Sequence, residues 1–420
     1  MMALGKVFLY IFSFILIYYT NGLPGINPYI FPITSLVGLG FLEAFSHKKD
    51  IYDHKDKRRM IKFIAGVVLS ALYFLLVYLT KNYEVTLDGT RLVQGLMFVV
   101  YFLIVYILMG YLDIFYKTAE KKMEFLFKVA SIQGVICLLM VFLPNLKSLA
   151  DNLFLYSSNF LEGDYILSSR VYGISNSYTY GLPILHGLLT SICFYYGMMK
   201  DKKYLLYLPL IFIVSILNGR TGIIVGIVGI AIVLVYLFIK SKNKNKIIPA
   251  ILGIALLLAV ARVIIEKFLP NVYTFIMSAL NEFITFVSTG ELSGTSLYLL
   301  KDGLILPEGV DLIFGTGNRV YGAESSIGVS SDIGFVNDLF MGGIIYAGIL
   351  YSSYIALISS TFRKKDISFM GVLIIFALLI ANWKGEIFKN ATFIIGLFFV
   401  VLINMIELKK EEGASWMKDR

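Results

Sequence analysis

Twelve long apolar runs divide this sequence, and they restrict its fold more than any other feature. A helix that crosses a membrane needs about 20 mostly apolar residues. Inside a bilayer the backbone must satisfy its own hydrogen bonds, so the sequence predicts an all-α, polytopic integral membrane helical bundle over residues 1–420. The expected transmembrane helices are residues 6–21, 28–46, 60–80, 91–112, 126–144, 178–199, 204–218, 221–240, 247–266, 335–361, 367–383 and 390–407.

Charged residues indicate which side of the membrane each connection faces. Cytoplasmic connections are enriched in Lys and Arg, and most of the 37 basic residues of this chain fall in every second connection. This pattern predicts a multi-pass protein with both termini in the cytoplasm. The net charge of +9 is carried largely at the ends of spans, so topology explains it and we expect no nucleic-acid partner. With 58% hydrophobic and 15% charged residues, the composition excludes a soluble enzyme.

Three polar stretches face the outer side in this topology. They are residues 145–177, the hairpin at 217–222 and a large extracytoplasmic loop at 266–335. Long connections without a function are uncommon, so we expect the large loop to form part of the active site. Its first part, residues 271–288, has apolar residues at helical spacing, which predicts a helix on the membrane surface or against the bundle.

Eleven basic residues run against the positive-inside tendency, because they lie on the outer side or in the outer half of a span. Some are expected to extend their charged ends to the lipid headgroups. Others should mark an anionic partner that approaches from outside. The eleven residues are Lys81, Arg91, Lys147, Arg170, Arg220, Arg262, Lys267, Lys301, Arg319, Lys384 and Lys389.

Arg220 is the strongest single candidate for a functional residue. The preceding span, residues 204–218, covers roughly 22 Å, which is less than a hydrocarbon core of about 30 Å. The hairpin tip should therefore lie below the outer surface, where a charge is costly and is by default functional. A guanidinium can hold diphosphate oxygens in a bidentate fork. The alternative is a helix-end arginine that contacts lipid phosphates, and the functional interpretation is favoured.

Two further arginines are candidates for binding an oxyanion. Arg319 follows the turn Gly315–Thr316–Gly317–Asn318, whose glycines can expose backbone N–H groups to a ligand. Arg170 lies in the outer stretch at 145–177, shortly before Gly173. A tight turn with a solvated arginine is the alternative for both, so both stay hypotheses.

Two acidic residues bracket the entry to the span at 335–361. Asp332 could take a proton from an attacking hydroxyl, or it could cap the helix N-terminus, and capping is favoured by a small margin. Lys384, at the outer mouth of the last hairpin, could bind substrate or pair with Glu386. The candidates for substrate binding are Arg170, Lys301, Lys384, Asn318 and Asp338.

The sequence gives little support for a metal or a cofactor, and we expect neither. Cys137 and Cys193 lie in apolar runs, as buried packing residues do. His186 lies inside the sixth span, where hydrogen-bonded packing is favoured over catalysis. The stretch Glu162–Gly163–Asp164 has ligand-like spacing, but one such tripeptide is weak support for a divalent cation.

At these residues the chain resembles the Wzy-type polymerases of bacterial polysaccharide repeat units and, more distantly, the O-antigen ligases. The shared features are the multi-span plan with one large outer loop late in the chain, the hairpin at 218–222, and residues 312–318 leading through 331–335 into a span. There are two departures from the pattern. The family often has another arginine early in the long loop, where this chain has residues 294–297 and then Lys301, and the ligase histidine is absent.

The resemblance implies a GT-C-like glycosyltransferase at the outer face of the bacterial cytoplasmic membrane. Donor and acceptor would both be undecaprenyl diphosphate-linked oligosaccharides in the lipid bilayer, joined into capsular or O-antigen-type polysaccharide. A chain-length regulator and a flippase are the protein partners it suggests. Under this hypothesis Arg220 and Arg319 stabilise the departing diphosphate, Arg170 or Lys384 holds the acceptor lipid, and Asp332 is the candidate base.

Two other classes of function stay open. A flippase for the same lipid-linked oligosaccharide would also use many spans and a basic cavity, but such transporters usually have repeated halves and helices broken near the midplane. The two halves of this sequence look unlike each other, and its polar content gathers in one late loop. A membrane assembly protein without catalysis is the third class, and the outer arginines make it the least favoured.

Overall fold

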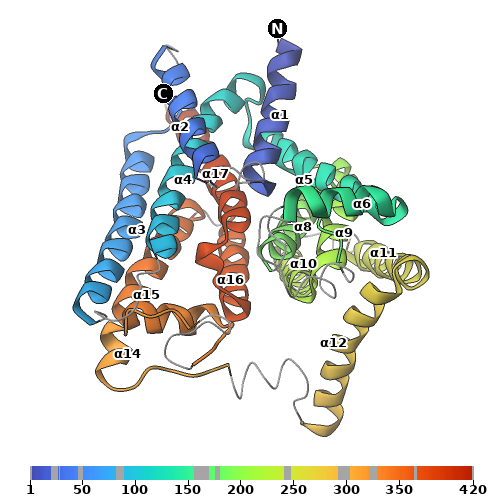
Figure 1. Ribbon diagram of the computed structural model, residues 1–420. Helices are drawn as coiled ribbons and strands as arrows, with labels where there is room; N and C mark the ends of the chain where they lie inside the picture. Colours follow the sequence, from blue (N-terminus) through green and yellow to red (C-terminus); the bar gives the residue numbers. More distant parts are fainter. Residues whose placement is uncertain are drawn as a thin grey trace. The chain divides into compact units, whose positions relative to one another are not determined.

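The computed structural model describes residues 2–19, 27, 29–45, 51–81, 89–155, 170–175, 180–240, 247–291, 303–320, 329–363 and 367–418 of the 420-residue chain. Within these ranges the regular structure is helical and contains no strand (Figure 1). Six of the described helices are long and apolar enough to cross a membrane. The fold is therefore that of a helical membrane protein.

The helices form two compact units. The α15 unit, named after α15 (Gly334–Thr361), consists of Met1–Leu9, Asn27–Met123 and Thr295–Arg420. The α8 unit, named after α8 (Gly181–Met199), consists of Tyr10–Ile26 and Glu124–Gly294.

Helices from both ends of the chain build the α15 unit. Its other elements are α2 (Ile30–Phe45), α3 (His54–Lys81), α4 (Gly89–Phe115), α14 (Val310–Phe314), α16 (Ser368–Lys384), the short 3-10 helix η4 (Ile387–Lys389) and α17 (Ala391–Lys418). α3 packs along α15, α4 packs against α17, and α2 packs against α4. Aromatic rings fill the centre, where Phe63 of α3 lies 5.1 Å from both Phe102 of α4 and Tyr354 of α15, measured between ring centroids.

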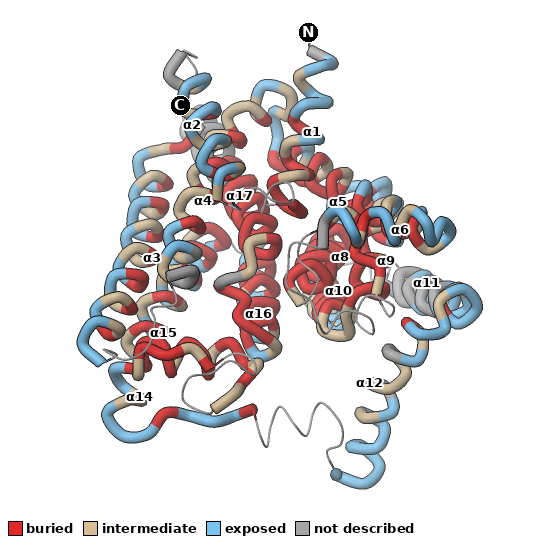
Figure 2. Tube along the Cα trace, in the orientation of Figure 1, coloured by how far each residue is buried: buried red, intermediate tan, exposed pale blue. Residues whose placement is uncertain are grey.

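The α8 unit is organised around α8, which is buried along nearly its whole length (Figure 2). The other elements are α1 (Met2–Tyr18, most of which belongs here), α5 (Ala119–Phe142), α6 (Pro144–Ala150), η1 (Asp151–Leu155), η2 (Lys202–Leu206), α9 (Leu208–Asn218), α10 (Arg220–Lys240), α11 (Ile247–Phe268) and α12 (Pro270–Thr289). Gly187 lets α8 approach α10 closely, since a Cβ there would overlap the carbonyl of Gly222. Small residues serve this purpose at contacts between membrane helices.

The buried polar residues predicted to be packing residues are confirmed as such. His186 is fully buried, 2.9 Å from the Tyr18 hydroxyl and 3.1 Å from the Ile211 carbonyl. Cys137 and Cys193 are buried and free. All three side chains therefore belong to the core of the α8 unit.

Each of the twelve ranges expected to span the membrane contains a helix, and the boundary before Leu208 is among those predicted wrongly. Residues 202–206 form the 3-10 helix η2, and α9 begins only at Leu208 with Pro209 in its first turn. Proline is favoured there because the N–H groups of the first turn have no partner inside the helix. α9 therefore has 11 residues and a length of about 16 Å. The helix predicted at 271–288 is confirmed as α12.

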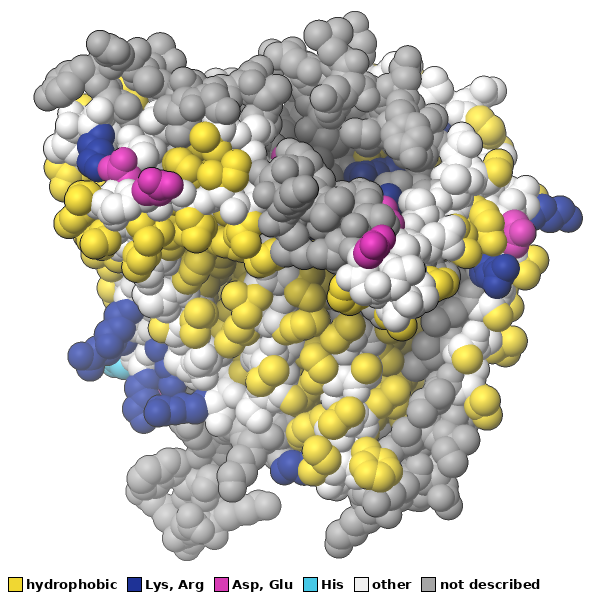
Figure 3. Space-filling model, turned by 90° about the horizontal axis from the view of Figure 1, so that it is seen from below, with side chains coloured by type: hydrophobic (Ala, Val, Ile, Leu, Met, Phe, Trp, Pro, Cys, Tyr) yellow, Lys and Arg dark blue, Asp and Glu magenta, His cyan; other side chains and the backbone are white. Residues whose placement is uncertain are grey.

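Many of the hydrophobic side chains of these helices are exposed at the surface. On the face drawn in Figure 3, hydrophobic side chains predominate between groups of charged ones. α3 illustrates this, because Ile61, Leu69, Leu72 and Leu76 are all exposed while Phe63 and Val67 on its other side are buried. An exposed apolar stripe of this length suits contact with lipid better than contact with water.

Candidate functional site

The tenth expected span is a broken helix. α15 has non-helical dihedral angles at Gly342 and Gly343, so a short first leg (334–341) joins a long second leg (344–361), and the two legs run in different directions (Figure 1). Gly343 has φ 65°, and a Cβ there would overlap the carbonyl of Ile313. Only glycine combines this backbone conformation with so close an approach. The break thus allows the residues around Gly315 to lie directly against α15.

The turn that carries Arg319 is attached to this break. In an unbroken helix the carbonyl of Phe340 would accept a hydrogen bond from the N–H group four residues later. Here it accepts from the backbone N–H of Thr316 at 2.7 Å and from the Thr316 hydroxyl at 2.9 Å. On the other side of Arg319, the N–H of Val320 donates to Oδ1 of Asn337 at 3.1 Å. The backbone is therefore fixed on both sides of Arg319.

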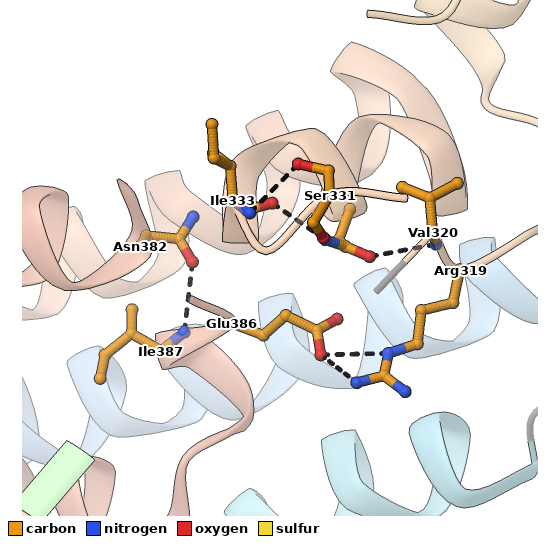
Figure 4. Close-up of polar contacts among 8 residues, drawn as sticks. Arg319, Val320, Ser331, Ile333, Asn382, Glu386 and Ile387 are labelled. Atoms are coloured by element: carbon orange, nitrogen blue, oxygen red, sulfur yellow. Dashed lines mark hydrogen bonds and ion pairs between the residues drawn. The ribbon is translucent and has the colours of Figure 1, made fainter. Parts of the chain in front are cut away.

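The guanidinium of Arg319 is held by Glu386. Nε and Nη2 of Arg319 both donate to Oε2 of Glu386, at 3.1 and 2.7 Å (Figure 4). Glu386 lies between α16 and η4 and its side chain is 3% exposed, whereas that of Arg319 is 27% exposed. Hydrogen bonds between two charged groups are the stronger kind. Arg319 is thus fixed in place where the first leg of α15 meets the α16–η4 connection, with part of its surface accessible.

A second buried polar cluster lies beside this pair. Oδ2 of Asp338 accepts hydrogen bonds from the Tyr351 hydroxyl at 2.6 Å and from the Asn382 amide at 3.3 Å. Asn382 also donates to the Tyr351 hydroxyl at 2.7 Å, and its Oδ1 accepts from the N–H of Ile387, next to Glu386, at 3.3 Å. The cluster ties both legs of α15 to α16. Asp338 is 1% exposed, and its role in substrate binding stays a prediction.

The structure corrects the favoured interpretation of Asp332 as a helix cap. The N-cap residue of α15 is Ile333, which has no side-chain cap. The hydroxyl of Ser331 accepts a hydrogen bond from the N–H of Ile333 at 3.2 Å, so the neighbouring serine satisfies that N–H. Asp332 is half-buried immediately before the helix, and its role as a base stays a prediction.

Two other candidates belong to the same region. One precedes Arg319 in the sequence, and the other lies close in sequence to its partner Glu386. Asn318 is 7% exposed, and its N–H donates to Oγ1 of Thr316 at 3.3 Å, which helps to close the turn. Lys384 is half-buried at the C-terminal end of α16, two residues before Glu386. The α15 unit therefore brings together Asn318, Arg319, Asp338 and Lys384 around the α16–η4 connection.

Arg220 occupies a different setting in the α8 unit. It is the first residue of α10, and its Nη1 lies 3.5 Å from Oε1 of Glu282 on α12, with the two side chains 25% and 19% exposed. A positive charge at a helix N-terminus is unfavourable because of the helix macrodipole, and Glu282 offsets it. The hairpin before Arg220 is fixed on the start of α8, where the Ser215 hydroxyl donates to the Pro183 carbonyl at 2.8 Å.

The stretch that carries Arg170 lies beside the hairpin that carries Arg220. The amide of Asn218 donates to the carbonyl of Val171 at 2.7 Å, and the N–H of Val171 donates to the carbonyl of Leu217 at 3.3 Å. Arg170 itself is half-buried. Two arginine-bearing segments from separate parts of the sequence therefore meet at one end of α9.

Several of the other cations predicted to lie on the outer side have carboxylate partners within the chain. Each has a neighbouring negative charge, which would lower the cost of an outer position in the predicted topology. The pairs are Lys81 with Asp311 of α14, Lys147 with Asp151 at 3.1 Å, and Arg262 with Glu266 at 3.9 Å.

Some predicted site residues lie outside the described part of the chain. These are Lys301 and the acidic stretch Glu162–Gly163–Asp164. Among the described residues, no group of three or more His, Cys, Asp or Glu side chains could hold a metal ion.

Sequence reasoning missed the acidic partner of each main arginine. The sequence points to Glu386 only as a partner of Lys384, and no pattern in it singles out Glu282. One signal for Glu386 is that it is the only acidic residue between Asp366 and Glu407, because a carboxylate inside an apolar stretch usually has a partner. No known protein family matches this sequence, and no curated protein matches it either.

Proposed function

We propose that this protein is a membrane glycosyltransferase that polymerises undecaprenyl diphosphate-linked oligosaccharide repeat units at the outer face of a bacterial cytoplasmic membrane. One observation carries the proposal. Arg319 and Arg220 are half-buried guanidiniums, one in each compact unit, and the backbone that carries each is fixed by the surrounding helices. Two fixed basic sites suit a reaction between two lipid diphosphates, because preorganised positive charge stabilises a transition state without further rearrangement.

In the proposed reaction a hydroxyl oxygen of the acceptor sugar attacks the anomeric carbon of the donor sugar. The bond between that carbon and the diphosphate oxygen breaks, and the diphosphate leaves with the bonding electrons. Arg319 and Arg220 are each candidates for stabilising the negative charge that develops on the departing diphosphate. The proton of the attacking hydroxyl passes to a base, for which Asp332 is the candidate. Arg170 and Lys384 are the candidates for holding the acceptor lipid.

The proposal includes a GT-C-like bundle of about twelve spans with both termini in the cytoplasm. The length of α9 supports a recessed position for Arg220, since about 16 Å of helix is only half of a hydrocarbon core of about 30 Å. Electrostatic attraction is stronger in such surroundings than in water. A recessed guanidinium would thus attract a lipid-linked diphosphate more strongly than one at the surface.

A flippase for the same lipid-linked oligosaccharide is the second candidate. The break in α15 at Gly342–Gly343 favours it, because transporters commonly build substrate sites from interrupted helices. Under this alternative the same arginines bind the diphosphate during transport, and no bond is made or broken.

The deciding experiment uses purified protein in liposomes with a synthetic undecaprenyl diphosphate-linked repeat unit, and products are separated by size on a gel. We expect a ladder of longer glycans from the wild type and a fall of about 10²–10³-fold in rate for Arg319→Ala and Arg220→Ala. Arg262→Ala is the matched control, because Arg262 is an outer arginine that is 65% exposed. Its ladder should persist. Absence of a ladder with several repeat units, together with movement of the lipid between leaflets, would favour the flippase.

A further inference from the structure

An apolar cavity of about 370 Å³ lies between α15 and α16 in the α15 unit. That volume falls within the range of about 300–1,000 Å³ typical of ligand sites. Its walls include Ile355 and Leu379, which are 41% and 61% exposed, so the cavity is open to the outside of the helices. Phe335 and Trp383 line one end of it, with ring centroids 5.2 Å apart.

The two polar residues in the cavity wall are already hydrogen-bonded to protein groups. Tyr351 and Asn382 line the cavity, and they bond to each other and to Asp338. A sugar or another polar ligand would have to compete with these bonds. A hydrocarbon chain would only replace lipid or water against apolar walls, which is favourable. The wall chemistry therefore selects a hydrocarbon.

Positive charge lies at the aromatic end of the cavity. Trp383 is followed directly by Lys384, the last residue of α16, so the lysine lies at the same end of that helix as the indole. Tryptophan rings prefer the boundary between hydrocarbon and headgroups. An apolar cavity that ends in an aromatic rim and a cation complements an amphipathic lipid with an anionic headgroup.

We infer that this cavity binds the isoprenoid chain of the acceptor polyprenyl lipid, with its phosphate or diphosphate at Lys384. The inference rests on the proposed function, which requires such a lipid as the substrate, and adds where the chain binds. It also gives the α15 unit a lipid site of its own, because the cavity and Lys384 both belong to that unit.

Trp383 provides a direct test. The chain has two tryptophans, so Trp416→Phe leaves Trp383 in the cavity wall as the only indole. The protein is placed in phosphatidylcholine nanodiscs, and a brominated polyprenyl phosphate is titrated while quenching of Trp383 fluorescence is recorded. We expect saturable quenching that unlabelled polyprenyl phosphate reverses and that neutral polyprenol reverses far less well.

Variants that fill the cavity separate this site from general contact with lipid. Leu379→Phe and Ile355→Phe should weaken the binding of polyprenyl phosphate about tenfold, because each displaces a few carbons of the chain. Val372→Phe on α16 and Ile344→Phe on α15 are matched controls, since both positions are exposed and lie outside the cavity wall. They should bind as the parent does.

These binding measurements test the lipid site separately from the proposed glycosyltransferase activity. Equal displacement by phosphatidylglycerol, or equal binding by the filling and control variants, would overturn the inference even if the protein makes a glycan ladder. Selective binding that Leu379→Phe abolishes would support the inference even if no ladder forms.

Discussion

The two main arginines of this protein are both paired with a carboxylate, but the pairs differ in kind. Arg319 makes two hydrogen bonds to a glutamate that is 3% exposed, and the shorter is 2.7 Å. Arg220 lies 3.5 Å from a glutamate that is 19% exposed. The first pair joins segments that pack closely, whereas the partner of Arg220 comes from α12, most of which is exposed (Figure 2).

This difference separates two roles that positive charge can have. A buried ion pair contributes little net stability, but removing one partner leaves an uncompensated buried charge. A partly exposed pair contributes little to stability, and removing one of its partners costs little. The Arg319 pair should therefore be part of the framework of the α15 unit, while Arg220 is held more loosely and is easier for an anionic ligand to recruit.

The largest effect is expected from breaking the buried pair. Arg319→Met should lower the free energy of unfolding by about 3–5 kcal/mol, because Glu386 then stays buried without its cation. The double variant Arg319→Met with Glu386→Leu should recover most of this loss of stability without restoring the glycan synthesis proposed above. Denaturant titration in detergent micelles measures the stability. A single variant as stable as the wild type would mean that the pair is not buried in solution.

A smaller effect is expected from the backbone that supports Arg319. Gly343→Ala places a Cβ at φ 65° against the carbonyl of Ile313, and such strain costs about 1–3 kcal/mol. Gly348→Ala, in the second leg of α15, is the matched control because a Cβ there meets no neighbour within 4 Å. It should be neutral or stabilising by up to about 1 kcal/mol. Hydrogen exchange at the Thr316 N–H would report release of the turn, which should accelerate only in Gly343→Ala.

The smallest effect is expected at the looser pair. Glu282→Gln should change the free energy of unfolding by no more than about 1 kcal/mol, because both side chains are partly exposed. Glu386→Gln should cost clearly more under the same conditions, since it removes the charge from a buried site. Parallel denaturation curves of the two variants make this comparison. Equal losses would remove the distinction between the two pairs.

The positions of the helices could be predicted from the sequence because hydrocarbon leaves a chain few alternatives. Each apolar run had to form a helix to satisfy its own backbone. The boundary before Leu208 is predicted too early because residues 204–206 are apolar or aromatic like a span yet are followed closely by Pro209. Hydrophobicity alone does not register a proline that starts a new helix.

The partners of the site residues could not be predicted in the same way. Glu386 lies 67 residues after Arg319, and nothing in the local pattern links the two positions. The break at Gly342–Gly343 gave no clear signal either, because glycine is common in membrane helices. The capping interpretation of Asp332 followed a sound local rule, but the hydroxyl of Ser331 accepts from the N–H of Ile333 instead.

The residues that pair at the α16–η4 connection are far apart in the sequence, so they are synthesised at different times. Arg319 is synthesised 67 residues before Glu386, and Asp338 is synthesised 44 residues before Asn382. Until α16 and the residues after it have left the ribosome and entered the membrane, Arg319 cannot pair with Glu386, and Asp338 has Tyr351 but not Asn382. The arginine turn is thus assembled early on α15 and completed only by the last hairpin. A chain that stalls before Glu386 would lack the buried carboxylate that holds the Arg319 guanidinium.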